Sequence, residues 1–317
     1  MNLATLKYIA AVDTYRNFVK AAEACGVTQP TLSIAIRNME EELDVVIFNR
    51  NSHPVEPTAI GKKIIAMARN TLHSAAQIDE LVRSERGEEG GEVSIGTIPT
   101  VAPYVLPGLF REMRSSLPHM RMKVAEMRTS FLVEKLRTGE IDIAIMSTPL
   151  GQKGLLEIPL YYEKFLAYVS PEDRLHALGE IPADKLPSER FWILEEGHCL
   201  RNQVLNFCHS RKRSHTEYQA GSIDNLIRVV DRNGGYTVIP ELHLSFLTET
   251  QRGNVRPIVG QPAGKGCEEC VPLREVSLVI HENFVREKLL NTVAECIKRT
   301  LPEDMLDSRL KRFAIRL

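Results

Sequence analysis

Hydrophobic positions at the start of the chain recur every three or four residues and predict three short helices within the first sixty residues. The second of these ends at Gly26, and the third begins at Thr28, a good N-cap residue followed by Pro30 in the first turn. The third helix would bury Leu32, Ala35, Ile36 and Met39 and turn outward Gln29, Thr31, Ser33, Ile34 and Arg37. Two helices joined by a short turn, the second with polar side chains at its start, are typical of a helix-turn-helix whose second helix enters the major groove of DNA.

Two short runs, 46–50 and 55–57, predict a hairpin that would act as a wing and carry polar side chains toward phosphates. Residues 1–61 hold five Lys and Arg against seven Asp and Glu, so any positive surface must be local. A helical domain with no role in DNA binding is the alternative on periodicity alone. The predicted DNA contacts are Thr28, Gln29, Pro30, Thr31, Ser33, Arg37, Arg50, Asn51 and His53.

From Thr58, a good cap, the pattern predicts one long helix that ends near Arg86. Its apolar side carries Ile60, Ile64, Met67, Ala68, Leu72, Ala75, Ile78 and Val82. A stripe of this length needs a partner, and a second copy of the chain would give a two-fold dimer with two recognition helices for an inverted-repeat operator. The polar, glycine-rich segment 87–91 indicates a hinge.

Beyond the hinge, strand-like segments at 93–96, 122–125, 141–145 and 165–169 alternate with helical stretches, which favours an α/β fold. Ligands of open α/β sheets bind at the carboxyl ends of strands. The loops that follow the first two strands hold Thr97, Pro99 and Thr100, then Thr129 and Ser130. The threonines are therefore candidate ligand contacts, with ordinary helix capping as the alternative.

Two cysteines, Cys199 and Cys208, flank a predicted helix that begins just after the first of them. The partial positive charge of a helix N-terminus, with Arg201 and His198 nearby, favours a reactive thiolate at Cys199. Cys208, on the apolar side of the same helix beside Phe207, suits a resolving thiol that condenses with a sulfenic acid. Two unrelated buried thiols are the alternative.

The geometry of that helix bears on what a disulfide would do. Nine residues of intact helix separate two points by about 13 Å, whereas bridged cysteines have Cα atoms within about 7 Å. Bond formation would therefore have to unwind the segment, which is the behaviour of a switch and not of a structural bridge.

Five runs resemble the LysR-type transcriptional regulators in order and spacing: FVKAA at 18–22, VTQPTLS at 27–33, MEEEL at 39–43, FNR at 48–50 and TAIG at 58–61. The resemblance implies a winged helix-turn-helix (1–58), a linker helix and hinge (59–91), and an α/β effector domain of periplasmic-binding-protein type (92–302). That domain would have two halves, 92–164 with 268–302 and 165–267, followed by a tail at 303–317. The chain departs from the family at His53, where arginine is common, and at Asp44, where glycine is usual, and both departures predict weaker backbone contacts with DNA.

Within this family, the run Gly-His-Cys-Leu-Arg and its second cysteine resemble the hydrogen peroxide sensors. That resemblance implies that Thr100 and Thr129 bind peroxide opposite Cys199, with His198 and Arg201 orienting it. It also implies a Cys199–Cys208 disulfide that refolds the domain, pairing of dimers into tetramers, and recruitment of RNA polymerase to antioxidant genes. A LysR-type regulator that answers a small organic effector is the alternative; a thiol peroxidase is disfavoured because no reductase motif is present.

Composition agrees with a cytoplasmic protein, and no cofactor is expected. The 317 residues carry a net charge of −1, no apolar run long enough to span a bilayer and no secretory signal, so the six cysteines should be mostly reduced. Cys267 and Cys270 have the spacing of half a zinc site, but without nearby partners a metal-free polar loop is preferred. Cys25 and Cys296 lie on apolar helix faces and are interpreted as packing residues.

Overall fold

The computed structural model describes residues 1–85, 90–187, 190–197, 199–207, 219–260 and 271–308. The chain divides into two compact units, one centred on residues 1–89 and the other on residues 90–133 and 141–282 with the C-terminal helix. The first unit is largely helical, and the second contains the large β-sheet.

The N-terminal unit contains the three predicted helices, α1 (Leu3–Tyr15), α2 (Phe18–Ala24) and α3 (Gln29–Leu43). Each begins at a side chain that accepts a hydrogen bond from a free backbone N–H: Asn2 from Thr5, Asn17 from Val19 and Lys20, and Thr28 from Thr31. Buried apolar residues from all three helices form one core, which includes Ile9, Val12, Ala21, Leu32, Ile36 and Met39. The helix-turn-helix prediction is confirmed.

The predicted wing is confirmed as an antiparallel pair, β1 (Phe48–Asn49) with β2 (Glu56–Pro57). The long helix follows as α4 (Ala59–Glu85), and Thr58 caps it by accepting from the Gly61 N–H at 2.9 Å. A Cβ at Gly61 would clash with the backbone carbonyl of Ile47, so this close approach of α4 to the wing requires glycine. Ile65 and Ala68 of α4 join the core of the N-terminal unit, while Met67 and Ile78 are exposed.

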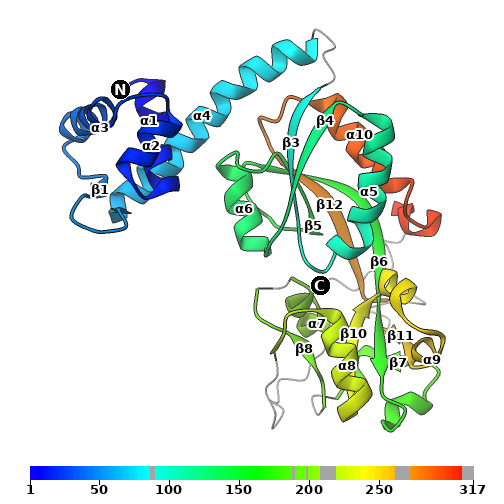
Figure 1. The fold of residues 1–317 in the computed structure, drawn as a ribbon. Coiled ribbons are helices and arrows are strands. Elements are labelled where there is room, and N and C mark those ends of the chain that lie inside the picture. Colours follow the sequence, from blue (N-terminus) through cyan, green and yellow to red (C-terminus); the bar gives the residue numbers. More distant parts are fainter. Residues whose placement is uncertain (86–89, 188–189, 198, 208–218, 261–270, 309–317) are drawn as a thin grey trace. The chain divides into compact units, whose positions relative to one another are not determined.

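The effector domain is the predicted α/β structure, in two halves (Figure 1). In the first half, β3 (Gly91–Thr97) runs parallel to β4 (Met120–Glu126) and β5 (Ile143–Thr148), and β12 (Leu273–His281) pairs antiparallel with β5. Helices α5 (Ala102–Ser116) and α10 (Glu287–Lys298) lie on one side of this sheet, and α6 (Thr129–Arg137) lies on the other.

The second half is built on the far end of one long strand, β6 (Leu155–Val169), which pairs with β12 in the first half and with β10 (Tyr236–Pro240) and β11 (Val255–Val259) in the second. The sequence predicted only its last five residues as a strand, because Pro159 and two glutamates interrupt the apolar pattern before them. The smaller elements are β7 (Ile181–Pro182), β8 (Ile193–Leu194), β9 (Gln219–Ala220), α7 (Cys199–Phe207), α8 (Ile223–Asn233), α9 (Glu249–Arg252) and the 3-10 turns η1 (Arg174–Ala177), η2 (Ala183–Lys185), η3 (Glu241–Phe246) and η4 (Glu303–Leu306).

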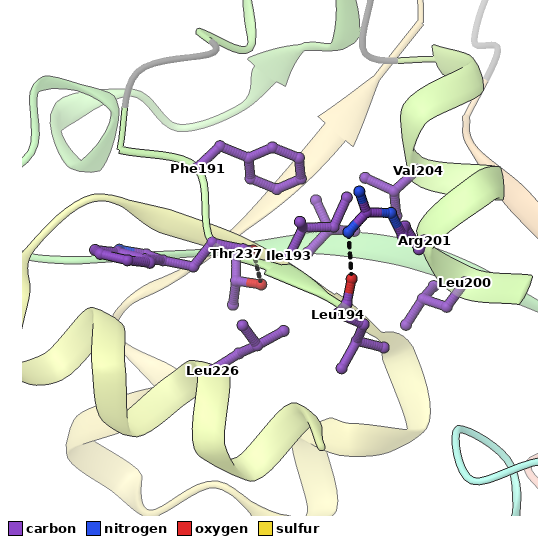
Figure 2. A pocket seen from close by; sticks show the side chains of 10 residues that line it. Phe191, Ile193, Leu194, Leu200, Arg201, Val204, Leu226 and Thr237 are labelled. Carbon is purple, nitrogen blue, oxygen red and sulfur yellow. Dashed lines mark hydrogen bonds between the residues drawn. The ribbon is translucent and has the colours of Figure 1, made fainter. Parts of the chain in front are cut away.

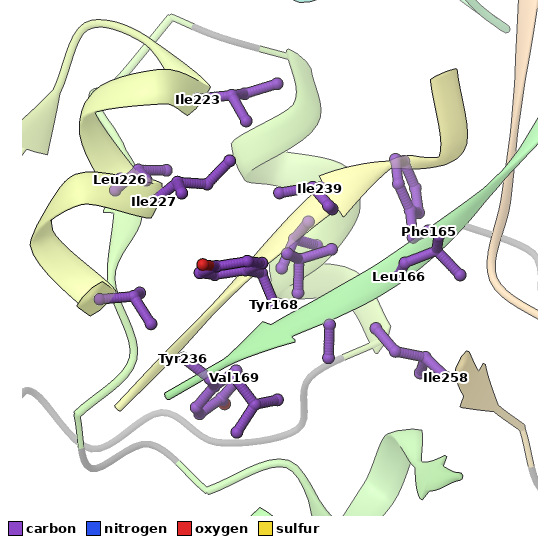
Figure 3. Close-up of a cluster of buried hydrophobic side chains, with 14 of the residues drawn as sticks. Phe165, Leu166, Tyr168, Val169, Ile223, Leu226, Ile227, Tyr236, Ile239 and Ile258 are labelled. Carbon is purple, nitrogen blue, oxygen red and sulfur yellow. The ribbon is translucent and has the colours of Figure 1, made fainter. Parts of the chain in front are cut away.

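The core of the second half holds these small elements to the strands (Figure 3). Ile223, Leu226 and Ile227 of α8 pack over Tyr168 of β6 and Ile239 of β10. Leu200 and Val204 of α7 belong to the same buried cluster. The apolar face of α7 therefore fixes where that helix, and the cysteine at its start, lies in the domain.

Candidate functional site

Helix α3 turns a polar face outward, as predicted. Gln29, Thr31 and Arg37 are exposed, whereas Leu32, Ile36 and Met39 are buried. The Thr28 and Thr31 hydroxyls lie 2.8 Å apart at the N-cap, so both help to begin the helix. Arg37 is 71% exposed and pairs only loosely with Glu41, at 3.3 Å one turn on. This face and the helix N-terminus above it are free to meet DNA phosphates and base edges.

Arg50 in the wing is held in place by the recognition helix. Its guanidinium donates to the Glu40 carboxylate at 2.8 Å and to the Ser33 hydroxyl at 3.2 Å, and it stacks 5.5 Å above the Phe18 ring. The other Glu40 oxygen accepts from the Ile47 N–H at 2.7 Å. Arg50 therefore braces the wing on α3, in addition to any phosphate contact, while Asn51 and His53 are exposed.

Asp44 lies at the C-cap of α3 in the left-handed backbone region, with φ of 51° and ψ of 45°. Glycine is favoured there because it has no Cβ to clash with the following carbonyl. The departure from the family pattern at this position thus costs backbone strain at the end of the recognition helix.

Helix α7 begins at Cys199 itself, which confirms the predicted position of this cysteine at a helix N-terminus. The Cys199 side chain is half-buried and is not part of a disulfide. The Arg201 guanidinium donates to the Leu194 carbonyl at 2.8 Å (Figure 2). It also lies 4.0 Å from the Glu196 carboxylate. The predicted ligand role of Arg201 stays untested, and its observed contact anchors the first turn of α7 to β8.

A different arginine supplies the positive charge near the thiol. Arg274 of β12 is fully buried and ion-paired with Glu163 of β6 at 2.6 Å. Burial alone would lower the pKa of Arg274, but the charge of Glu163 first, and then those of Tyr161, Cys199 and Tyr104, raise it. The guanidinium therefore stays charged, and Cys199 lies within its electrostatic reach.

Thr100 belongs to the same cluster. Its hydroxyl accepts from Arg274 at 3.1 Å and its carbonyl accepts from the same guanidinium at 2.7 Å. Helix α5 has no side-chain cap, so Thr100 is not the ordinary capping residue that the alternative interpretation required. Arg274, Glu163 and Thr100 thus connect both long strands to the loop after β3.

Several buried polar atoms of the effector domain have no hydrogen-bond partner among the residues that the structure describes. They are the Thr129 hydroxyl, the Gln203 side-chain carbonyl and the Ser147 hydroxyl; the Tyr161 hydroxyl, also buried, has the Glu163 carboxylate beside it. Gln203 lies one helical turn after Cys199 and so shares its face of α7. Ser147 and Tyr161 flank Val276 on neighbouring strands and point to the Arg274 side of the sheet. Unpaired buried polar atoms are costly, so each of them is a candidate contact for a ligand.

Sequence reasoning missed Gln203, Arg274, Glu163 and Tyr161. Spacing along α7 would have found Gln203, because a residue four positions after Cys199 lies on the same face. Four of the predicted residues, His198, Cys208, Cys267 and Cys270, lie outside the described residues. Cys25 is half-buried and Cys296 is buried beside Ser116, in agreement with packing roles. No helix within the described ranges is long and apolar enough to cross a membrane.

Comparison with known proteins decides the family. Residues 3–62 match the bacterial regulatory helix-turn-helix of the LysR family, and residues 86–302 match the LysR substrate binding domain. The chain belongs to the LysR family. As a LysR-type regulator it binds DNA through its helix-turn-helix and is not an enzyme.

Three similar proteins show which members of the LysR family this chain resembles. The hydrogen peroxide-inducible genes activator of Haemophilus influenzae is 34% identical over 280 residues, covering 88% of this chain and 90% of that protein. The structure of a full-length OxyR variant from Pseudomonas aeruginosa aligns with a TM-score of 0.77 and 29% identity, covering 94% and 95% of the two chains. A hydrogen-peroxide-bound OxyR variant of Corynebacterium glutamicum aligns with a TM-score of 0.60 and 25% identity over 94% and 92%. This LysR-family chain is therefore OxyR-like over nearly its whole length.

Proposed function

We propose that the protein is a hydrogen-peroxide-sensing transcriptional regulator that switches through Cys199. The observation that carries this proposal is the position of Cys199 at the N-terminus of α7, within reach of the buried Arg274 guanidinium. A helix N-terminus and a fixed cation both stabilise negative charge beside them, and the thiolate is the form of cysteine that attacks peroxide. The OxyR-like relatives, one of them with hydrogen peroxide bound, support the choice of ligand.

The unpaired polar atoms give peroxide its contacts. Thr129 and Gln203 offer a hydroxyl and a carbonyl without partners, and the Thr100 hydroxyl, which already accepts from Arg274, has a proton to donate. Hydrogen peroxide is small, donates two hydrogen bonds and accepts several, so it can satisfy such groups together. His198 and Arg201 remain proposed contacts.

The chemistry proceeds in two steps. The Cys199 thiolate attacks one peroxide oxygen, so that an S–O bond forms, the O–O bond breaks and hydroxide leaves to take up a proton as water. The Cys208 thiol then displaces the hydroxyl of the sulfenic acid, forming the disulfide and releasing a second water. The sum is two thiols and one peroxide giving one disulfide and two waters.

Helix α7 is intact from Cys199 to Phe207, a length of about 13 Å. We infer that a bond between Cys199 and Cys208 unwinds part of this helix, because bridged cysteines have Cα atoms within about 7 Å. We infer that this refolding rearranges a dimer joined by α4, whose apolar side chains Met67, Ile78 and Val82 are exposed in the single chain. The dimer, pairing into a tetramer, would bind an inverted-repeat operator in the cytoplasm. In the oxidised state it would recruit RNA polymerase to antioxidant genes.

Peptide mapping tests this function. The reduced full-length protein is mixed with one equivalent of hydrogen peroxide, alkylated and mapped by mass spectrometry. The expected product is a rapid and selective Cys199–Cys208 linkage that is absent from a Cys199→Ser variant. A linkage at Cys267–Cys270 instead, or oxidation spread over the cysteines, would contradict the proposal.

A LysR-type regulator that binds a small organic effector is the second candidate. The specific observation in its favour is the number of unpaired polar atoms in the effector domain, which a polar organic ligand could also satisfy. Its signature is a Cys199→Ser variant that is still fully inducible in cells.

A further inference from the structure

An ion pair joins the two halves of the effector domain beside the cysteine site. Arg128 follows β4 in the first half, and its Nη2 lies 2.5 Å from Oε1 of Glu195, which follows β8 in the second half. The two side chains are 42% and 34% exposed, so water screens the pair only in part.

The stem of Arg128 also packs on the segment that leads to Cys199. Gly197 adopts a φ of +96°, and a Cβ added there would lie 2.8 Å from Cδ of Arg128. Residues 195–197 are therefore held by a charge contact at one end and by close packing at the other. Only glycine permits this approach with that backbone conformation.

Both residues of the ion pair are close in sequence to residues of the proposed peroxide site. Arg128 directly precedes Thr129, and Glu195 lies four residues before Cys199. The helix behind Cys199 is anchored separately, by buried Leu200 and Val204 and by the contact of Arg201 with the Leu194 carbonyl. The backbone of this segment keeps its own contact, since the Glu195 N–H donates to the Ala220 carbonyl at 3.0 Å. Loss of the ion pair would thus loosen the side-chain hold on residues 195–197 without displacing α7 or Arg274.

We propose that Arg128 and Glu195 form a latch that holds the reduced conformation and sets the peroxide dose at which the disulfide closes. This inference rests on the proposed function, because it concerns the second step, in which Cys199 leaves the start of α7 to meet Cys208. The latch opposes that departure and does not take part in the attack on peroxide. Arg128 and Glu195 are positioning residues in this account.

The test measures the two chemical steps separately in the full-length protein. Sulfenic acid formation is followed with Cys208→Ser in the background, by trapping with dimedone, and disulfide closure is followed with Cys208 intact, by alkylation and mass spectrometry. For R128Q and E195Q we expect the first step to stay within about twofold of wild type. Closure should be faster by about two- to fivefold, the range of a partly exposed ion pair.

Three controls separate a latch from a general loosening of the domain. The gain in closure rate should shrink in 1 M salt, which screens the pair. The charge swap R128E with E195R should restore slow closure. K123Q, which breaks the 2.5 Å pair of Lys123 with Glu92 in the same half, should leave both steps unchanged.

Two results would overturn the latch. Closure at the wild-type rate in R128Q and E195Q would mean that Cys208 travels to a Cys199 that stays in place. A slower first step would mean that the pair positions the peroxide site. If the wild-type protein never forms the Cys199–Cys208 bond, the proposed function itself fails, and the latch fails with it.

Discussion

Helix α3 takes its DNA-facing groups from one continuous segment, whereas the site around Cys199 is assembled from six segments of the effector domain. Gln29 and Arg37 are exposed and have few partners. Arg274 and Glu163 are fully buried, contact each other at 2.6 Å and are 111 residues apart in sequence. A change at an exposed residue of α3 should therefore alter binding alone, while a change at Arg274 or Glu163 should alter stability and chemistry together.

The largest expected effect is on stability. Arg274→Ala leaves the Glu163 carboxylate buried without its partner, so the free energy of unfolding should fall by about 3–5 kcal/mol. Arg37→Ala, the matched change on α3, should stay within about 0.5 kcal/mol of wild type. Urea unfolding of the two variants measures the difference, and equal small losses would remove the contrast between the two regions.

On the DNA side, Gln29→Ala should weaken binding to the operator by about 1–3 kcal/mol, the value of a bidentate contact with adenine. The free energy of unfolding should not change, because Gln29 is exposed. Binding isotherms at fixed salt, beside chemical unfolding, check both parts. If the variant lost as much free energy of unfolding as free energy of binding, the claim that Gln29 acts on DNA binding alone would be contradicted.

Thr129→Val should separate chemistry from stability within the effector domain itself. The hydroxyl has no partner in the described structure, so replacing it with a methyl group should leave stability equal or higher. The reaction of Cys199 with peroxide should slow by about 2- to 10-fold, because one hydrogen bond worth about 0.5–1.5 kcal/mol is lost. Stopped-flow mixing with peroxide gives the rate, and an unchanged rate would remove Thr129 from the site.

Asp44→Gly is expected to stabilise the N-terminal unit by about 1 kcal/mol, because glycine adopts the left-handed conformation without strain. Operator affinity should not fall. Thermal unfolding of the single variant against wild type measures the gain. A destabilised variant would show that the aspartate side chain makes a compensating contact.

The smallest effect concerns pH. His243 is buried, its Nδ1 lies 2.7 Å from the Tyr104 hydroxyl and its Nε2 lies 4.0 Å from Asp224. Burial lowers the pKa of His243 below 6.5, an effect that Asp224 partly offsets. The unfolded chain then binds the proton more readily, so this contribution to stability is complete above about pH 6.5 and declines as the pH falls below it. Between pH 7.5 and 5.5, the free energy of unfolding should therefore fall less steeply with pH for His243→Gln than for wild type.

The local elements were predictable from sequence because their signals are local. The Thr28 cap with Pro30 and the Thr58 cap each act within a few residues, and helices α3 and α4 begin where expected. The Arg274–Glu163 pair was not predictable, since nothing near either residue marks the other. Its only sequence signal is an arginine within an otherwise strand-like run at 273–281. The full length of β6 was hidden by Pro159 for a similar reason: the pairing with β12 that sustains it is long-range.

The most direct test of the account compares footprints on the protein's own promoter before and after one equivalent of peroxide. Wild-type protein should change its protected region on oxidation and recover it on reduction, while Cys199→Ser should keep the reduced footprint throughout. An identical footprint of the wild-type protein in both states, or the same change in Cys199→Ser, would contradict the claim that Cys199 controls how this regulator holds DNA.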